Sequence, residues 1–145
     1  MLSPGSGDDR LFGGPGPDTA WFFEASDPLR VDLGTGRASG QGTDMLWSIA
    51  RIVGGYAADV LIGSSRDEKF VGGWGEDLIK GHGGNDRIQG HHGEDRLFGG
   101  EGDDRLEGLY DRDILDGGPG SDQLDGGPKW DRCRSGESLE RCEGL

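Results

Sequence analysis

The chain has 145 residues, enough for one domain; 31 are glycine, and hydrophobic residues make up only 31% of the total. Its formal net charge of −13 argues against nucleic-acid binding, because phosphates would be repelled and not neutralised. No apolar run approaches the roughly 20 residues that a membrane-spanning helix needs, so we expect no membrane span.

A nine-residue pattern opens the chain, with copies at residues 4–12 and 13–21 that carry Asp9 and Asp18 at their sixth positions. Residues 22–53 break this period. They still alternate turns with short apolar runs, and the stretch "GTDMLWSIARIV" keeps the Asp-x-apolar spacing with Asp44 and Leu46. We therefore expect residues 22–53 to form an irregular coil of the same unit, not a second domain.

Nine nonapeptides follow without a gap over residues 54–134. The first position is glycine in all nine copies, the eighth is apolar or cysteine, and the sixth is an acid, which is Glu68 in the second copy. The other eight copies have aspartate at the sixth position: Asp59, Asp77, Asp86, Asp95, Asp104, Asp113, Asp122 and Asp131.

The physical requirements of one copy predict a fold. Glycines at positions 1 to 6 permit a tight turn with positive φ, and positions 7 to 9 suffice for a short strand whose middle residue points inward. Two copies then make one coil of 18 residues, with odd copies (from 54) on one sheet and even copies (from 63) on the other. The pattern predicts an all-β protein, a parallel β-solenoid of 18-residue coils.

The spacing of the sixth-position acids predicts that the protein binds a metal ion. Stacked strands lie about 4.8 Å apart, so each sixth-position acid would face the acid two copies later, and their repulsion requires a cation between the turns. Ca²⁺ accepts six to eight oxygen ligands in irregular geometry, whereas Mg²⁺ requires a near-ideal octahedron. The alternative is that the acids form a solvated charged face.

The repeats resemble the repeats-in-toxin (RTX) family of hemolysin-type calcium-binding nonapeptides, whose consensus is Gly-Gly-x-Gly-x-Asp-x-apolar-x. The best copies are residues 72–80, 99–107 and 117–125. The resemblance implies a parallel β-roll with several Ca²⁺ ions between its turns, in a secreted or extracellular surface protein. It implies metal ligands at Asp9, Asp18, Asp59, Asp77, Asp86, Asp95, Asp104, Asp113, Asp122 and Asp131.

Four sites are expected to be the best formed. Their acid pairs are Asp77 with Asp95, Asp95 with Asp113, Asp86 with Asp104, and Asp104 with Asp122. The flanking copies depart from the consensus, because Arg66 and Lys129 replace the glycine of the fourth position.

The two cysteines lie near the C-terminus. Cys133 occupies an inward eighth position, and Cys142 follows nine residues later, at the corresponding slot of the opposite sheet. Side chains that face each other across a narrow roll are within disulfide reach, so we expect a disulfide that closes a C-terminal cap at residues 135–145. The alternative is two buried thiols.

We expect residues 1–145 to be a single calcium-binding module that folds on binding Ca²⁺ outside the cell. No hydrolase, zinc-protease or P-loop motif is present, so we do not expect an enzyme. The alternative function is a calcium-stabilised adhesive or self-associating surface element. Its contact surface would be the sheet of the odd copies, which points apolar residues outward: Val60, Leu78, Phe98 and Ile114.

Overall fold

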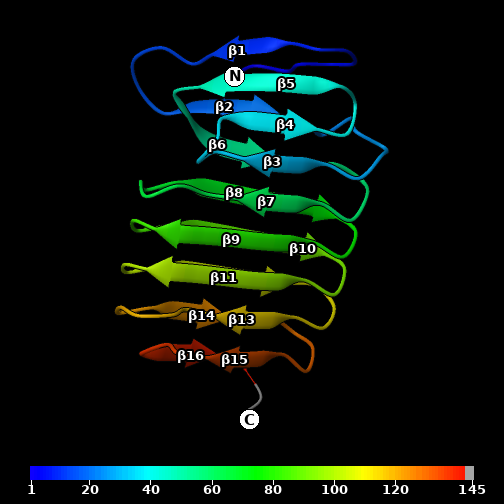
Figure 1. Ribbon diagram of the computed structural model, residues 1–145. Helices are drawn as coiled ribbons and strands as arrows, with labels where there is room; N and C mark the ends of the chain where they lie inside the picture. Colours follow the sequence, from blue (N-terminus) through cyan, green and yellow to red (C-terminus); the bar gives the residue numbers. More distant parts are fainter. Residues whose placement is uncertain (143–145) are drawn as a thin grey trace.

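The computed structural model describes residues 1–142 as two facing β-sheets whose strands stack like rungs (Figure 1). The nine-stranded sheet has the order β1-β5-β4-β3-β7-β9-β11-β13-β15. Its strands are β1 (Arg10–Phe12), β3 (Arg30–Asp32), β4 (Arg37–Ser39), β5 (Thr43–Trp47), β7 (Val60–Ile62), β9 (Leu78–Gly83), β11 (Arg96–Glu101), β13 (Ile114–Asp116) and β15 (Arg132–Arg134).

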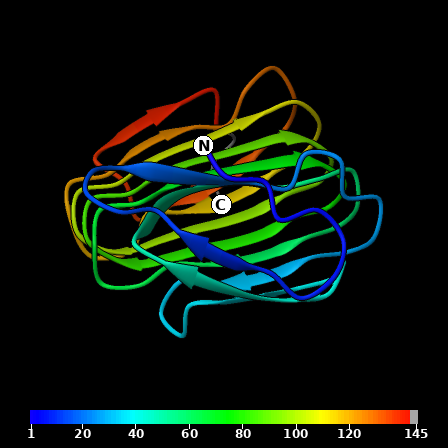
Figure 2. The same ribbon diagram turned by 90° about the horizontal axis from the view of Figure 1, so that it is seen from above.

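The seven-stranded sheet lies behind it in the order β16-β14-β12-β10-β8-β6-β2. Its strands are β2 (Asp18–Trp21), β6 (Ile49–Val53), β8 (Lys69–Trp74), β10 (Arg87–His92), β12 (Arg105–Leu109), β14 (Gln123–Asp125) and β16 (Ser138–Glu140). Seen from above in Figure 2, the chain winds from one sheet to the other and back in every coil. Among the described residues, no helix is long and apolar enough to cross a membrane.

The register of the strands confirms the predicted β-solenoid with 18-residue coils. Leu61 pairs with Ile79, and Ile79 with Leu97, in parallel strands of the odd copies. The even copies stack in the same way in the other sheet, where Phe70 pairs with Ile88. The eighth-position side chains are at most 4% exposed and fill the space between the sheets: Leu61, Phe70, Ile79, Ile88, Leu97, Leu106, Leu115, Leu124 and Cys133. One inward side chain per copy therefore builds the core.

Residues 22–53 form the irregular part of the stack. Strands β3, β4 and β5 are joined as antiparallel neighbours, while β3 pairs in parallel with β7 and β5 with β1. Leu29, Val31 and Ala38 from this segment are buried in the same core cluster as the regular copies. The short strands were expected, but the antiparallel excursion was not, because nothing in the nine-residue spacing signals a reversal of direction.

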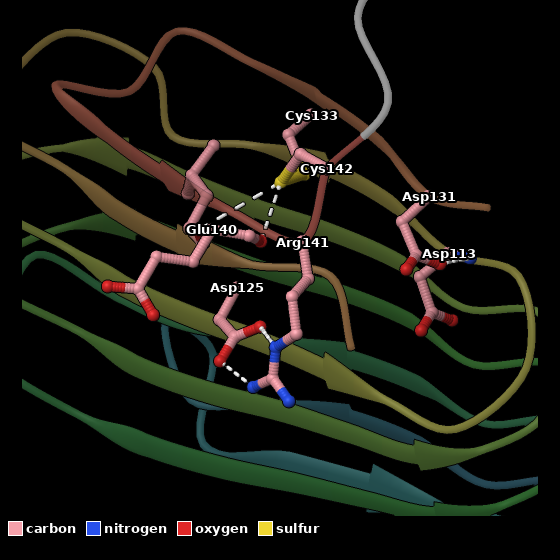
Figure 3. Close-up of a disulfide and its surroundings, with 8 residues drawn as sticks. Asp113, Asp125, Asp131, Cys133, Glu140, Arg141 and Cys142 are labelled. Atoms are coloured by element: carbon pink, nitrogen blue, oxygen red, sulfur yellow. Dashed lines mark hydrogen bonds and ion pairs between the residues drawn. A yellow bond between two sulfur atoms is a disulfide. The ribbon is translucent and has the colours of Figure 1, made fainter. Parts of the chain in front are cut away.

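Cys133 and Cys142 form a disulfide with their Cα atoms 5.6 Å apart, as the sequence predicts (Figure 3). The position of Cys142 differs from the prediction. The position in register with Leu124 belongs to Leu139, which is 51% exposed, and Cys142 follows after β16 ends. The reason is that the last turn, residues 135–137, is three residues shorter than a regular one, so the last strand begins early. Residues 143–145 of the predicted cap lie outside the described part of the chain.

Candidate metal centre

The sixth-position acids lie in two columns, one along each edge where the turns stack. Asp59, Asp77, Asp95, Asp113 and Asp131 precede the strands of the nine-stranded sheet, and Glu68, Asp86, Asp104 and Asp122 precede those of the other sheet. All nine acids are at most 2% exposed. The structure thus brings together the acids that the repeat pattern predicts, and it buries them.

In each aspartate of the columns, one carboxylate oxygen accepts a backbone N–H of the preceding coil. The N–H of Asp77 donates to Oδ1 of Asp95, and the N–H of Asp95 donates to Oδ1 of Asp113, both at 2.8 Å. The same bond recurs along both columns at 2.8–2.9 Å. These bonds fix each carboxylate in the gap between two successive turns.

The second oxygen, Oδ2, has no hydrogen-bond donor in most of these carboxylates. It is buried and unpartnered in Asp9, Asp77, Asp86, Asp95, Asp104, Asp113, Asp122 and Asp131. A buried carboxylate oxygen without a partner is costly, and buried charges are normally paired or coordinate metals. These oxygens therefore mark places where the protein alone leaves a charge unsatisfied.

The protonation of the columns reflects the same burial. Loss of hydration raises the pKa of Asp77 to about 8, and repulsion by Asp95 and Asp59 adds to the effect. Burial also raises the pKa values of Asp86, Asp95 and Asp113 to about 7. A proton or a cation must neutralise these groups inside the stack.

The first glycine of each copy makes room for its carboxylate. A Cβ atom built on Gly72 would lie 2.2 Å from Oδ2 of Asp77 and 2.7 Å from the carbonyl oxygen of Gly90 in the next coil. The backbone of Gly72 does not have positive φ, so space and not conformation requires glycine here. The carboxylate oxygen and a backbone carbonyl oxygen thus share one small cradle.

Positive φ is required elsewhere in the turns. Six consecutive copies, over residues 72–125, have positive φ at both the second and the fourth position. In the copy from residue 108, Leu109 and Asp111 adopt this conformation without being glycine, at φ 80° and 72°. Arg66 and Lys129, at the fourth position of flanking copies, do not. The regular turns therefore coincide with the four acid pairs that the sequence favours.

Two acids at the N-terminal end of the columns are satisfied by the protein itself. Asp59 accepts the N–H groups of Leu29 and Gly55, one on each oxygen, both at 2.9 Å. Glu68 accepts the N–H of Ser64 at 2.7 Å and its hydroxyl at 2.5 Å. These two carboxylates lack the unpartnered oxygen that the acids after them share.

The first two copies contribute acids that differ from each other. The N–H of Asp9 donates to Oδ1 of Asp44 at 3.0 Å, which repeats the bond of the regular columns. Asp44 was not among the predicted ligands, although its Asp-x-Leu spacing is the signal that identifies it. Asp18 begins β2 and pairs in register with Ile49 of β6, so no acid occupies the position paired with it.

The oxygen atoms that line the gaps between successive turns are suitable ligands for a hard cation. Within residues 1–142, no three side chains of His, Cys, Asp or Glu gather closely enough to hold a metal by themselves. Each gap instead offers acids from two successive coils and the backbone carbonyls of the glycine turns, such as that of Gly90. Carboxylate and carbonyl oxygens in irregular geometry suit Ca²⁺, and the absence of nitrogen and sulfur ligands does not suit Zn²⁺.

Comparison with protein families gives a match to one, the RTX calcium-binding nonapeptide repeat in four copies, over residues 4–21, 71–106 and 98–128. A comparison with curated proteins found no match. The matched residues make up just over half of the chain, and the stretch from 71 to 128 contains all six regular turns and the acids from Asp77 to Asp122. With its 18-residue coils and stacked acids, the chain belongs to the RTX calcium-binding repeat family.

Proposed function

We propose that this chain is a β-roll module that binds several Ca²⁺ ions between its turns and folds when it does so. The observation that carries the proposal is the row of buried, unpartnered Oδ2 atoms, because each needs a positive charge that the described protein does not supply. Calcium, when bound, supplies that charge and replaces the proton that burial otherwise retains.

The backbone and the carboxylates of the protein would have different roles in holding the ion. The backbone N–H of one coil holds Oδ1 of the acid in the next coil, which leaves Oδ2 available for the ion. The best supported gaps are those between Asp77 and Asp95, Asp95 and Asp113, Asp86 and Asp104, and Asp104 and Asp122. Asp131 with Asp113, and Asp9 with Asp44, have similar bonds. Asp18 and Asp59 are the least supported ligands, since Asp18 faces no acid and Asp59 has both oxygens occupied.

We further propose that the whole chain acts as one module outside the cell. One hydrophobic cluster extends from Leu11 to Cys133 through the irregular segment, which supports a single unit. The Cys133–Cys142 disulfide supports an oxidising compartment. Extracellular calcium modules bind with dissociation constants of about 10⁻⁴–10⁻³ M, which suits a chain that stays unfolded where Ca²⁺ is scarce.

Circular dichroism tests this proposal. In excess chelator the chain should lose its β-sheet signal, because binding free energy contributes to folding free energy in such a protein. Millimolar Ca²⁺ should restore the signal, and the same concentration of Mg²⁺ should not. An identical β-sheet spectrum in chelator and in Ca²⁺ would refute folding on binding.

A second candidate function is self-association through the nine-stranded sheet. Leu78 and Phe98 point outward from β9 and β11 and are half-buried, and Ile114 on β13 is 37% exposed. An apolar patch of this kind often marks a contact. Sedimentation velocity in Ca²⁺ should show an oligomer that the double substitution Leu78→Lys with Phe98→Lys dissociates. A wild-type chain that is monomeric at high concentration would exclude this role.

The aromatic side chains in the turns that lead from the seven-stranded sheet into that sheet favour a structural role. Trp74 stacks on His92 with ring centroids 4.0 Å apart, and His92 stacks on Tyr110 at 4.5 Å. The faces of these rings therefore cover one another along the stack. The stack stiffens the turns of three successive odd copies, which hold Asp77, Asp95 and Asp113.

A further inference from the structure

Four cations form a column on the outer face of the seven-stranded sheet. Arg51 pairs in register with Lys69, Lys69 with Arg87, and Arg87 with Arg105, on the parallel strands β6, β8, β10 and β12. All four side chains are exposed. Neighbouring strands are about 4.8 Å apart, so the column extends over about 14 Å. It lies on a protein whose net charge is −13.

The first three cations of the column have no ionic partner. Arg105 pairs with Glu107 at 2.6 Å, but within residues 1–142 no carboxylate lies within 4.0 Å of a charged nitrogen of Arg51, Lys69 or Arg87. The difference arises from the residue two positions after each cation. This residue is Val53, Val71 or Gln89 beside the unpaired cations and Glu107 beside the paired one. We call Arg51, Lys69 and Arg87 the cationic strip.

The cationic strip destabilises the folded protein when no ligand is bound to it. Like charges directly opposite each other on neighbouring strands destabilise a sheet. Asp67 lies near Lys69 and Arg87, where it lines the same hollow, but its Oδ1 accepts the N–H of Asn85 at 2.8 Å. Three consecutive coils thus present positive charge that this fold does not neutralise.

A shallow groove follows the strip. Its volume is about 230 Å³, and Val71 and Gln89 line it together with the three cations of the strip. Arg105 and Glu107 also line it, and the charge of Glu107 is paired with that of Arg105. The amide of Gln89 donates to Glu107 at 2.6 Å, which leaves its carbonyl oxygen available to a hydroxyl group. The groove therefore combines a row of evenly spaced positive charges with an apolar floor and a neutral acceptor.

We propose that the cationic strip binds a linear anionic polysaccharide, laid along the stack across successive coils. A chain of one-sugar width can contact the strip while its anionic groups stay away from the acidic turns. A nucleic-acid duplex or an anionic membrane is broader and would meet the acidic edge at Asp67. Single-stranded nucleic acid is bound with aromatic stacking, and neither the four cations of the column nor the residues two positions after them have an aromatic ring.

The test measures binding of dextran sulfate fragments to the calcium-loaded protein, with neutral dextran of the same length as the control ligand. The strip variant is R51Q with K69Q and R87Q. The matched variant is K80Q with R96Q and R132Q, which removes the same charge from exposed residues of the opposite sheet that are not consecutive in register. Both variants should keep the wild-type β-sheet spectrum in Ca²⁺, since the strip variant removes like-charge neighbours and the matched variant changes only exposed side chains.

We expect the strip variant to raise the dissociation constant for dextran sulfate by at least about tenfold at low salt, and to reduce the slope of log K against log salt by about two to three. The matched variant should bind as the wild type does. Equal losses in both variants would mean that only net charge matters and would overturn the assignment. So would unchanged binding by K69Q alone, at the centre of the strip, or equally tight binding of duplex DNA or anionic vesicles.

Discussion

The acids of the columns should differ in their effect on calcium binding according to the number of gaps that each one serves. Asp95 lies between two gaps, because the N–H of Asp77 donates to its Oδ1 and its own N–H donates to Asp113. The substitution Asp95→Asn keeps an acceptor for the first bond and replaces the unpartnered Oδ2 with an NH₂ donor, which repels a cation. Asp59→Asn makes the same chemical change where both oxygens are already satisfied by N–H groups.

The magnitude follows from linkage. A site with a dissociation constant of about 10⁻⁴ M stabilises the fold by about 2.7 kcal/mol at 10 mM Ca²⁺. Asp95→Asn damages two sites and should cost about 5 kcal/mol, a large part of the 5–15 kcal/mol typical of a domain. Asp131→Asn damages one gap, so its cost should be about half as large. Asp59→Asn should change calcium-dependent stability the least.

Calcium titrations followed by far-ultraviolet circular dichroism give the midpoint of folding for each variant, and urea denaturation at 10 mM Ca²⁺ gives the loss in stability. Asp104→Asn, on the opposite edge, should match Asp95→Asn because it also serves two gaps. Equal shifts for Asp95→Asn, Asp131→Asn and Asp59→Asn would refute the shared-ligand reasoning, as would a midpoint for Asp95→Asn no higher than that of the wild type.

Three further changes test other parts of the structure. In chelator, lowering the pH from 8 to 5 should increase the β-sheet signal. Burial raises the pKa of Asp77 from 3.8 to about 8, so over this range the folded chain binds protons that the unfolded chain does not, and protonation favours folding. A spectrum in chelator that does not change with pH would contradict this. Reduction of the Cys133–Cys142 disulfide should increase hydrogen exchange in β16, because it removes roughly 2–3 kcal/mol of stabilisation. The amides of Asp86 and Asp104 should stay protected, and a uniform loss of protection along the chain would contradict a local role of the disulfide. Gly72→Ala should abolish calcium-dependent folding measured by circular dichroism, whereas Gly83→Ala, whose Cβ would meet no atom closer than 3.8 Å, should be neutral.

Much of the fold could be predicted because the repeat encodes it one coil at a time. Glycine at position 1, acid at position 6 and an apolar residue at position 8 define the turn, the column and the core, and the observed register of Leu61, Ile79 and Leu97 follows from an 18-residue coil. The pairing of odd copies with odd copies also follows, since a coil returns to the same sheet after two repeats. Periodicity carries three-dimensional information here because each copy contacts mainly its neighbours in the stack.

The remaining features depend on contacts that the period does not specify. The antiparallel β3–β4–β5 excursion follows from turn geometry within residues 22–53, where no repeat exists. The shortened turn before β16 moves Leu139 into the slot predicted for Cys142. Whether an acid is left unpartnered also depends on its neighbours. Glu68 is satisfied because Ser64 stands at the second position of its turn, where the consensus has glycine.

The regular array from residue 54 to residue 134 differs in its need for calcium from one end to the other, because only its first two acids have hydrogen-bond donors on both carboxylate oxygens. Asp59 and Glu68 have hydrogen-bond partners on both oxygens, and Asp59 is bonded to the N–H of Leu29, a core residue of the irregular segment. From Asp77 onward, each copy adds one inward apolar side chain and one unpartnered oxygen. Because the stability of a repeat protein is a sum of coil and interface contributions, a coil that stacks on ordered neighbours needs less calcium than one that must order alone. The first gaps to fill should therefore adjoin Asp77 and Asp86, and the array should order from there toward Asp131, where the disulfide holds the last coil.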